Sequence, residues 1–528
     1  MTGAIIENLS NRKLIGILTV LCAAQILFFI LGGVISPSPS STMEFTMTPC
    51  TDESHTTTAG TMADRWYYIR PPKSGCTKQS LAQPTASSLV FVAQMPHVRD
   101  NVQLEYSPWM STLVAVFTMT VSNEPAFAAN WNGMDHELTL DIRLGYQTHS
   151  DSPTVWRELA SDRIKRKLQC HIDSNRLHPE YTTQCEPMEL FELGSVDYPF
   201  YLLNVRLPDC DQQNATNAPN CNIGRPTEFG VVTIIQNGGF TAVWLAMKTF
   251  LTLLVCIAVW WYWRRVQLLA RQPYLLEKAI MALGVATICL NFPIEWLSLL
   301  VRMPFMLLLS DMRQGLFYVV LFSFWLIFTG EHLLDENASK NNLAAYTRYL
   351  SFVLIACACM LVFDLSERGM HLGNPFFSIW SSDVGANFAY LFLVLAVLCS
   401  LTYFVFLTYK IYRVLTTIKR KRVSLQQMAQ NRRLKFEGII YRFRFLMFLT
   451  LICAALTVAG FLVEQIGEDQ LHWGDFDESP LLLNTTSAFL TGTYGLWNIY
   501  VLLLLSMYAP SHKIYRGAAK PRAGLEPF

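Results

Sequence analysis

The sequence is poor in charged residues. Only 15% of its 528 residues are Asp, Glu, Lys or Arg, against about 25% in soluble proteins. This composition excludes a soluble enzyme whose whole surface faces water. It also excludes a disordered scaffold, because 52% of the residues are apolar and disorder requires low hydrophobicity. The formal net charge of +1 says nothing about nucleic acid, and we expect no nucleic-acid partner.

Catalytic motifs are absent as well. His136-Glu137 opens HELTL, which lacks the second histidine of an HExxH zinc site, and the GxGxxG, P-loop and GxSxG patterns do not occur. Cys357-Ala-Cys359 is not a CxxC, and the histidines outside the apolar runs do not have metal-ligand spacing. Nothing in the sequence argues for an enzyme, and we expect no catalytic residues, no metal and no cofactor.

Long apolar runs are what the sequence does contain. A helix of about 20 apolar residues crosses the roughly 30 Å hydrocarbon layer of a membrane, and eight runs are long enough. Their approximate bounds are Leu14–Ile35, Thr241–Trp263, Leu275–Leu300, Gln314–Leu334, Tyr346–Leu365, Val384–Tyr409, Phe443–Ile466 and Ser487–Tyr508. The first run exceeds a signal-peptide core and has no A-x-A-like cleavage site, so we expect an uncleaved anchor.

Basic residues predict the orientation of these spans. The loop 410–444 holds eleven Lys or Arg and one acid, whereas the loop 467–486 holds five acids and no Lys or Arg. Eight spans then leave both termini in the cytosol and place residues 36–240 in the lumen or outside the cell. The stretch Lys419–Arg422 fits a plain positive-inside loop better than a site for anionic lipid or coat proteins.

The segment 36–240 has the pattern of a β domain. Apolar and polar residues alternate at period two in 136–144 (HELTLDIRL) and 200–207 (FYLLNVRL), and Pro, Asn and Gly separate the short runs. This pattern predicts a β-sandwich of one domain's size.

Cysteines and sequons agree with an oxidising compartment for this segment. Six of the thirteen cysteines lie in it: Cys50, Cys76, Cys170, Cys185, Cys210 and Cys221. An even number suggests disulfides. Fifteen pairings are possible, and proximity in the sequence favours Cys50–Cys76, Cys170–Cys185 and Cys210–Cys221. Two glycosylation sequons, at Asn214 and Asn484, are predicted to face the lumen.

Charges deep inside apolar runs are costly and mark either an ion pair or a function. Lys248 and Glu295 fall at similar depths in the second and third spans. We predict a structural Lys248–Glu295 pair; the alternative is a polar group that lines a cavity. Asp364, Glu367 and Arg368 sit at a helix end and are interpreted as interfacial.

The fourth and eighth spans are rich in aromatic residues. Helical spacing in the fourth puts Phe317, Phe324 and Phe328 on one face and Tyr318, Phe322 and Trp325 on another. These faces suit either ordinary packing and lipid contact or a cavity for a lipid chain. Small residues in 491–498 (TGTYGLWN) permit close helix approach or leave room for a ligand.

Seven stretches distributed from end to end carry a family resemblance. They are GAIIEN (3–8), NGGFTAVWLAMKTFLT (237–252), WYWRR (261–265), RQGLFY (313–318), GEH (330–332), NPFFSIW (374–380) and YAPSHK (508–513). With these stretches in this order, the chain resembles the Wntless family of cargo receptors for lipidated Wnt proteins.

The resemblance implies a polytopic α-helical membrane protein with eight transmembrane helices, a GPCR-like seven-helix bundle and an inserted lumenal β-sandwich domain. The implied domains are a cytosolic N-terminus with the first helix (1–35), the lumenal domain (36–240), the bundle (241–508) and a cytosolic tail (509–528). Such proteins bind palmitoleoylated Wnt and carry it to the cell surface through the endoplasmic reticulum, Golgi, endosomes and plasma membrane. Membrane lipids, trafficking adaptors and retromer are the other implied partners.

Within this interpretation, we expect the acyl chain to lie in the bundle among five aromatic residues. They are Phe317, Phe322, Trp325, Tyr494 and Trp497. A chain of sixteen carbons exposed to water costs about 10 kcal/mol, at roughly 0.8 kcal/mol per CH₂. A carrier must therefore shelter the chain and still release it.

The chain departs from the family pattern in three places. The family's endocytic motif Tyr-Glu-Gly-Leu corresponds here to the positions from Phe436 to Ile439, which read Phe-Glu-Gly-Ile. Loss of the phenol hydroxyl should weaken adaptor binding. The tail after Tyr508 is short, and Cys210 and Cys221 look like an additional pair.

Two other classes of function remain as alternatives. A GPCR-like signalling receptor would also place seven spans after a ligand-binding domain, but no Asp-Arg-Tyr-like triplet closes the third span of the bundle. A membrane O-acyltransferase would need an intramembrane histidine, and His332 lies near the cytosolic end of the fourth span.

Overall fold

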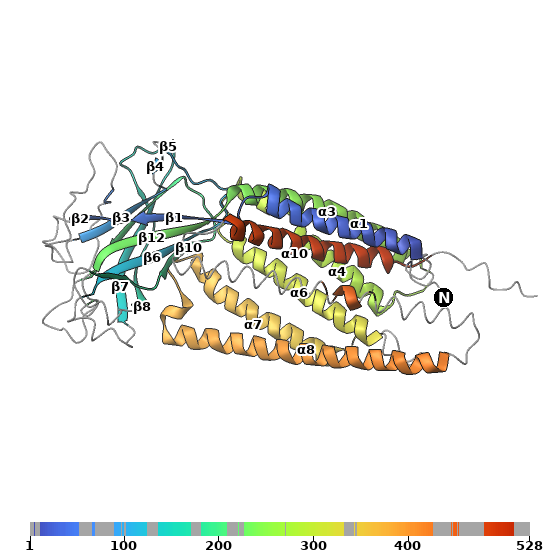
Figure 1. Ribbon diagram of the computed structural model, residues 1–528. Coiled ribbons are helices and arrows are strands. Elements are labelled where there is room, and N and C mark those ends of the chain that lie inside the picture. The colour runs from blue at the N-terminus through green and yellow to red at the C-terminus, as the bar shows by residue number, and fades with distance from the viewer. Residues whose placement is uncertain are drawn as a thin grey trace, which may run out of the picture.

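The computed structural model has a β domain at one end and a bundle of long helices at the other (Figure 1). It describes residues 5, 11–51, 66–68, 89–96, 98–99, 102–123, 136–170, 181–208, 220, 226–269, 271–331, 343, 346–425, 445, 447–450, 452 and 480–511.

Seven helical segments among these residues are long and apolar enough to cross a membrane. They are α1 (Asn11–Ile30) with the π-helical η2 (Leu31–Ile35), α3 (Gly238–Gln267), α4 (Leu275–Asn291) with α5 (Glu295–Ser298), α6 (Met306–Glu331), α7 (Thr347–His371), α8 (Asp383–Leu425) and α10 (Pro480–Met507). The prediction of a polytopic helical protein is therefore confirmed. The predicted span Phe443–Ile466 lies almost wholly outside the described residues, so the count of eight stays a prediction.

The outer faces of these helices are apolar. Leu253, Trp260 and Val394 each expose more than half of their surface. A helix satisfies its backbone hydrogen bonds internally, so it can present such a face to lipid without an energetic penalty. The long apolar runs therefore make helices whose sides suit a bilayer.

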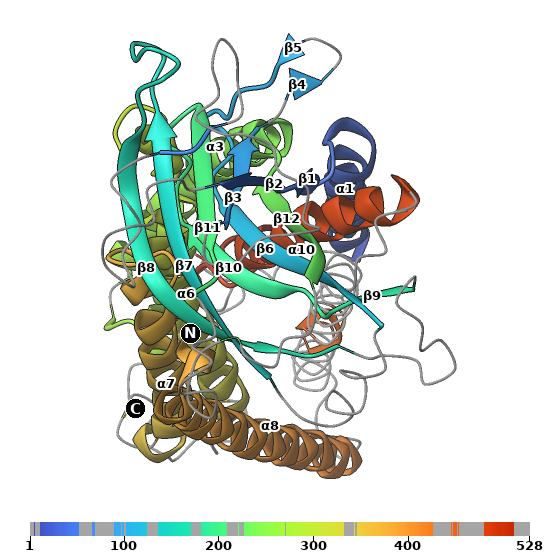
Figure 2. The same ribbon diagram turned by 90° about the vertical axis from the view of Figure 1, so that its left-hand side faces the viewer.

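Among the described residues, the β domain contains two antiparallel five-stranded sheets, and Figure 2 views the molecule from the end where this domain lies. One sheet has the order β1 (Ser40–Thr46), β12 (Pro226–Gln236), β6 (Leu113–Ser122) and β10 (Met188–Leu193), with β9 (Thr182–Gln184) also paired to β6. The other has the order β2 (Thr48–Thr51), β3 (Leu89–Met95), β11 (Phe200–Arg206), β7 (His136–Gln147) and β8 (Arg157–Leu168). Strands β4 (Val98–Arg99) and β5 (Val102–Gln103) form a separate hairpin-like pair.

The period-two pattern of the sequence explains the core between the sheets. Side chains on alternate positions of β7 point inward, and those of Leu138, Leu140 and Leu144 are fully buried. Phe91 and Phe229 meet with ring centroids 4.3 Å apart, one from each sheet. The predicted β domain is confirmed as a domain rich in antiparallel sheet.

Cys170 and Cys185 form a disulfide, 15 positions apart in the chain. Cys50 is disulfide-bonded too. The other predicted disulfide residues, Cys76, Cys210 and Cys221, lie outside the described residues, as do Asn214, Phe436 and Ile439. Asn484 lies in the first turns of α10. The remaining pairings and the glycosylation sites stay predictions.

Helices α1 and α10 pack closely through small residues. Gln25 Nε2 donates to the Gly492 carbonyl at 2.8 Å, and Thr491 Oγ1 donates to the Phe28 carbonyl at 3.1 Å. A Cβ atom added at Gly495 would overlap the ring of Phe28. Within 491–498, the structure shows close helix approach at Gly492 and Gly495, while Thr493, Tyr494 and Trp497 line the cavity described below.

We expect Gly495→Leu to displace Phe28 and loosen α1. An added side chain in a tight contact typically destabilises by about 1–3 kcal/mol. Thermal unfolding of the purified protein in detergent measures the effect. Gly16→Leu is the matched control, because a Cβ there meets nothing within 4 Å. Equal melting temperatures for the two variants would contradict the prediction.

The β domain joins the helices where η2 leads into β1, where β12 leads into α3, and at the segment that follows α7. Strand β12 runs directly into α3, whose first turn is capped by Asn237 Oδ1, which accepts from the Gly239 N–H at 2.9 Å. Residues 372–378, which follow α7 and are called the plug below, return to the β domain and bury Phe376 in its core.

Candidate functional site: a cavity between the helices

A cavity of about 1060 Å³ lies between α3, α4, α6, α7, α8 and α10. Ligand pockets typically span about 300–1,000 Å³, so this one has room for a large ligand. The cavity is partly open, since Leu316, Leu354 and Leu361 line it and are also exposed.

Aromatic and aliphatic side chains line the middle of the bundle. Phe322 lies about 24 Å along α6 from Met306, at 1.5 Å per residue. Its ring stacks on Tyr318 with centroids 5.9 Å apart and meets Tyr403 at 5.6 Å and Phe404 at 6.0 Å. All four residues line the cavity. This end of the site is suited to an apolar chain.

The structure brings four of the five predicted acyl-chain residues to this cavity. Phe317, Phe322, Tyr494 and Trp497 line it. Trp325 does not: its ring packs behind Phe322 at 5.5 Å and Trp497 at 6.1 Å, and its Nε1 donates to the Tyr500 hydroxyl at 3.2 Å. Three residues advance about 300° around a helix, so Trp325 lies about 60° from Phe322 and faces α10.

The end of the cavity nearer the β domain is charged. Lys248, Asp311, Asp364 and Arg368 line it. Asp311 lies in the second turn of α6 and accepts a hydrogen bond from Arg368, in the last turn of α7. The cavity is therefore amphipathic, with charges toward the β domain and aromatic rings deeper in the bundle.

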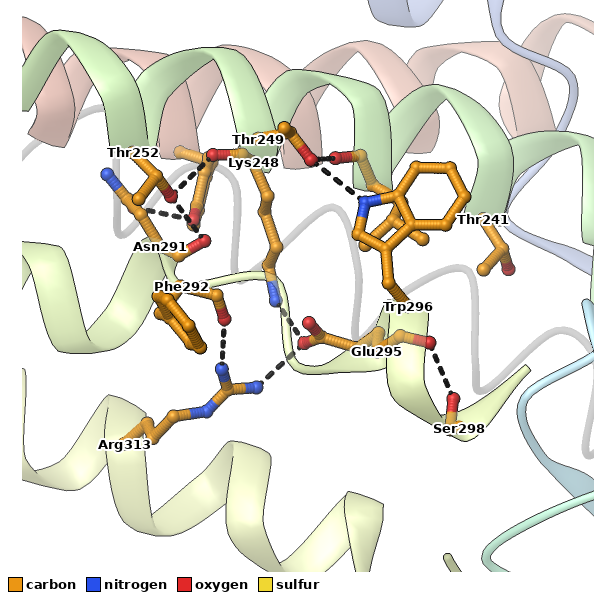
Figure 3. A network of polar contacts seen from close by, with 12 residues as sticks. Thr241, Lys248, Thr249, Thr252, Asn291, Phe292, Glu295, Trp296, Ser298 and Arg313 are labelled. Carbon is orange, nitrogen blue, oxygen red and sulfur yellow. Dashed lines mark hydrogen bonds and ion pairs between the residues drawn. The ribbon is translucent and has the colours of Figure 1, made fainter. Parts of the chain in front are cut away.

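Behind the charged end lies a buried triad of ionic side chains (Figure 3). Glu295 Oε1 accepts from Lys248 Nζ and from Arg313 Nη2, each at 2.7 Å. The Lys248 and Arg313 side chains are only 6% and 5% exposed. Two cations share one carboxylate, so the loss of that carboxylate would leave both uncompensated.

A break between α4 and α5 places Glu295 in this position. Pro293 lacks an N–H, and the helix ends at Asn291. Arg313 Nη1 donates to the Phe292 carbonyl at 2.6 Å, so the same guanidinium also satisfies the broken backbone (Figure 3). The triad thereby links α3, α5 and α6.

A neutral hydrogen-bond chain continues from the break toward α10. Thr252 Oγ1 donates to the Asn291 carbonyl at 2.8 Å, and the Tyr494 hydroxyl donates to Asn291 Oδ1 at 2.6 Å. Asn291 Nδ2 in turn donates to Asn498 Oδ1 at 2.5 Å. Tyr494, which lines the cavity, is thus hydrogen-bonded to the end of α4.

The structure brings Lys248 and Glu295 together and places Lys248 in the cavity lining as well. The ion pair and the cavity-lining role, set out as alternatives from the sequence, are therefore both present. The sequence did not identify Arg313 as a third member of this ionic cluster. The fourth span was expected to begin at Gln314, whereas α6 begins at Met306, because the apolar residues from Leu307 to Leu309 extend the helix.

Among the described residues, no group of three or more His, Cys, Asp or Glu side chains is arranged to hold a metal ion. The site therefore consists of an apolar cavity, a charged end and the ionic triad behind it. Its shape and polarity suit the binding of an amphipathic ligand.

Comparisons with known proteins match nearly the whole chain. Residues 237–512 match the family described as Wntless-like, transmembrane domain, and residues 48–236 match Wntless, GOLD domain. The chain is 48% identical to a Caenorhabditis elegans protein wntless homolog, over 98% of this chain and 93% of that protein. It is 42% identical to protein wntless of Drosophila grimshawi (97% and 90%) and 41% identical to protein wntless homolog B of Xenopus laevis (99% and 94%).

Proposed function

Because the chain belongs to the Wntless family, we propose that it is a cargo receptor that binds palmitoleoylated Wnt proteins and carries them to the cell surface. The family supports a Wnt transport role and not that of a signalling receptor, and it is not a known family of enzymes. The amphipathic cavity is the observation that supports the acyl-chain part of this proposal.

The acyl chain of the cargo occupies the aromatic part of the cavity. Phe317, Phe322, Tyr494 and Trp497 face this space, and each CH₂ transferred from water into such surroundings gains about 0.8 kcal/mol. The charged end suits the polar polypeptide to which the chain is attached. The body of the Wnt then lies against the β domain.

Topology and traffic follow from the same proposal. The β domain is lumenal and both termini are cytosolic, as the distribution of basic residues predicts. The protein cycles among endoplasmic reticulum, Golgi, endosomes and plasma membrane, with membrane lipids, adaptors and retromer as partners. Phe436 in the place of the family's tyrosine weakens adaptor-dependent retrieval.

Co-purification of a co-expressed Wnt, with and without an inhibitor of Wnt acylation, tests the proposal. We expect recovery of Wnt to fall at least tenfold under the inhibitor, because the cavity then has no ligand. Equal recovery would contradict the cavity mechanism and assign recognition to the β domain alone. No recovery under either condition would contradict the cargo-receptor role itself.

A further inference from the structure

The plug (residues 372–378) is a part of the helical bundle that completes the core of the β domain. Phe376 is only 1% exposed and belongs to the hydrophobic core of the sandwich. Its ring meets Phe191 edge to face with centroids 6.0 Å apart. The Glu192 N–H donates to the Pro375 carbonyl at 3.0 Å, so the plug also extends the backbone bonding of β10.

The outer strand of the other sheet holds the plug from a second side. Arg166 on β8 donates from Nη2 to the Phe376 carbonyl at 2.7 Å and from Nε to the Glu189 carbonyl at 2.9 Å. Asn374 Nδ2 donates to Asp162 Oδ2 at 2.5 Å. One guanidinium thereby joins β8, β10 and the plug.

Polar contacts also fix the end of α7 to the β domain and to the segment that follows the helix. His371 Nδ1 lies 3.1 Å from Glu192 Oε2, and its Nε2 lies 2.8 Å from the Phe377 carbonyl. Glu367 Oε2 accepts from the Ile379 N–H at 3.0 Å. Burial opposes ionisation of Glu192, but His371 and Arg368 together hold the pKa of Glu192 below its ordinary value. The turn from α7 into the plug is therefore held at both ends.

This turn lies directly beside the ligand cavity. Arg368 lines the cavity and also lines a smaller space of about 150 Å³ between the β domain and the helices, together with His371 and Pro375. Only eight positions separate Arg368 from Phe376. A displacement of the plug would therefore also displace the part of α7 that lines the cavity.

The two walls of the cavity are attached to the β domain in different ways. The α3 wall continues from β12 through the Asn237 cap. The α7–α8 wall is attached through the plug and through the His371–Glu192 contact at the end of α7. Figure 1 shows α7 and α8 together at the edge of the bundle farthest from α1. Without the plug, that wall would keep its contacts with neighbouring helices and the His371–Glu192 contact with β10.

We propose that the plug is a positioning element, which holds the α7–α8 wall at a fixed distance from the β domain so that one cargo molecule engages both. This inference rests on the proposed function. A cargo with a polypeptide body and an acyl chain binds at two places at once. Such binding gains 10²–10⁴-fold only if the two places are correctly spaced. Phe376 and Arg166 act through this spacing and need not touch the cargo.

The test compares two probes on full-length protein. One probe is acylated Wnt, which engages both places; the other is a radiolabelled palmitoleate in detergent solution, which engages only the cavity. The variants are Phe376→Ala and Arg166→Ala, with Arg166→Lys as the conservative substitution. Arg157→Ala is the matched control, because Arg157 lies on the same strand and its ion pair with Asp151, at 2.8 Å, stays within the β domain.

We expect Phe376→Ala and Arg166→Ala to weaken Wnt binding about 100-fold while palmitoleate binding changes less than twofold. Arg166→Lys should recover part of the loss, and Arg157→Ala should match the parent protein. Arg166→Ala leaves Phe376 in place, so it keeps the test decisive if the phenylalanine variant fails to fold.

Three results would overturn the inference. If the folded variants bind Wnt like the parent protein, or lose both probes in equal proportion, the plug does not set the spacing. If the parent protein binds acylated Wnt but no palmitoleate, the cavity part of the proposed function fails, and this inference fails with it.

Discussion

Gly315→Phe is expected to abolish recovery of acylated Wnt while the protein remains folded. Gly315 lines the cavity, and a Cβ atom there meets nothing within 4 Å, so a ring can enter the space without a clash. If the ring displaces about four methylenes of the acyl chain, roughly 3 kcal/mol is lost, which corresponds to about a 100-fold fall in affinity. Co-purification with acylated Wnt measures this fall.

The control for this variant is Gly369→Phe. A Cβ atom at Gly369 also meets nothing within 4 Å, but this residue does not line the cavity. Both substitutions replace a helical glycine and should each stabilise their helix slightly. Gly315→Ala, which leaves most of the space open, should retain binding. Full Wnt recovery by a folded Gly315→Phe protein would show that the acyl chain does not bind in this cavity.

Glu295→Ala is expected to produce the largest loss of stability of any single substitution considered. It leaves Lys248 and Arg313 buried without a counter-charge, and removal of one partner from a buried ion pair typically costs about 3–5 kcal/mol. We expect the variant to accumulate poorly in membranes and to melt far below the parent protein in detergent.

Lys248→Met distinguishes this electrostatic cause from a loss of packing. It removes one of the two cations and leaves a neutral Arg313–Glu295 pair at 2.7 Å, so the loss of stability should be much smaller. A Lys248→Met protein as unstable as Glu295→Ala would show that the triad contributes through shape and not through charge balance.

The strength of the sequence signal differs among the parts of this fold. Apolar runs and period-two alternation are local patterns, and each repeats over many residues, so helices and strands could be located directly. Lys248 and Glu295 stood out because charges are rare in apolar runs. Their common depth then suggested the pair that the structure contains.

Features that depend on packing between distant segments leave no local pattern in the sequence from which they could be predicted. Trp325 shares a helix face with Phe322, yet it turns toward Tyr500 and away from the cavity. Phe376 lies in a short apolar stretch between two spans, and its partner Phe191 is in another domain. The cavity itself is defined by six helices at once, so aromatic content could suggest it but could not delimit it.

The pairing of α1 with α10 has a consequence for how the protein is made. Gln25 and Gly492 bond across 467 positions of the chain. At a synthesis rate of about 5–20 residues per second, the first helix waits in the membrane for roughly 20–90 s before its partner emerges from the ribosome. During that time the glycines and Gln25 of this first segment have no contact with α10. The contacts between α1 and α10 can therefore form only after the last helix has entered the membrane. A chain truncated before α10 leaves this face of α1 without its partner helix.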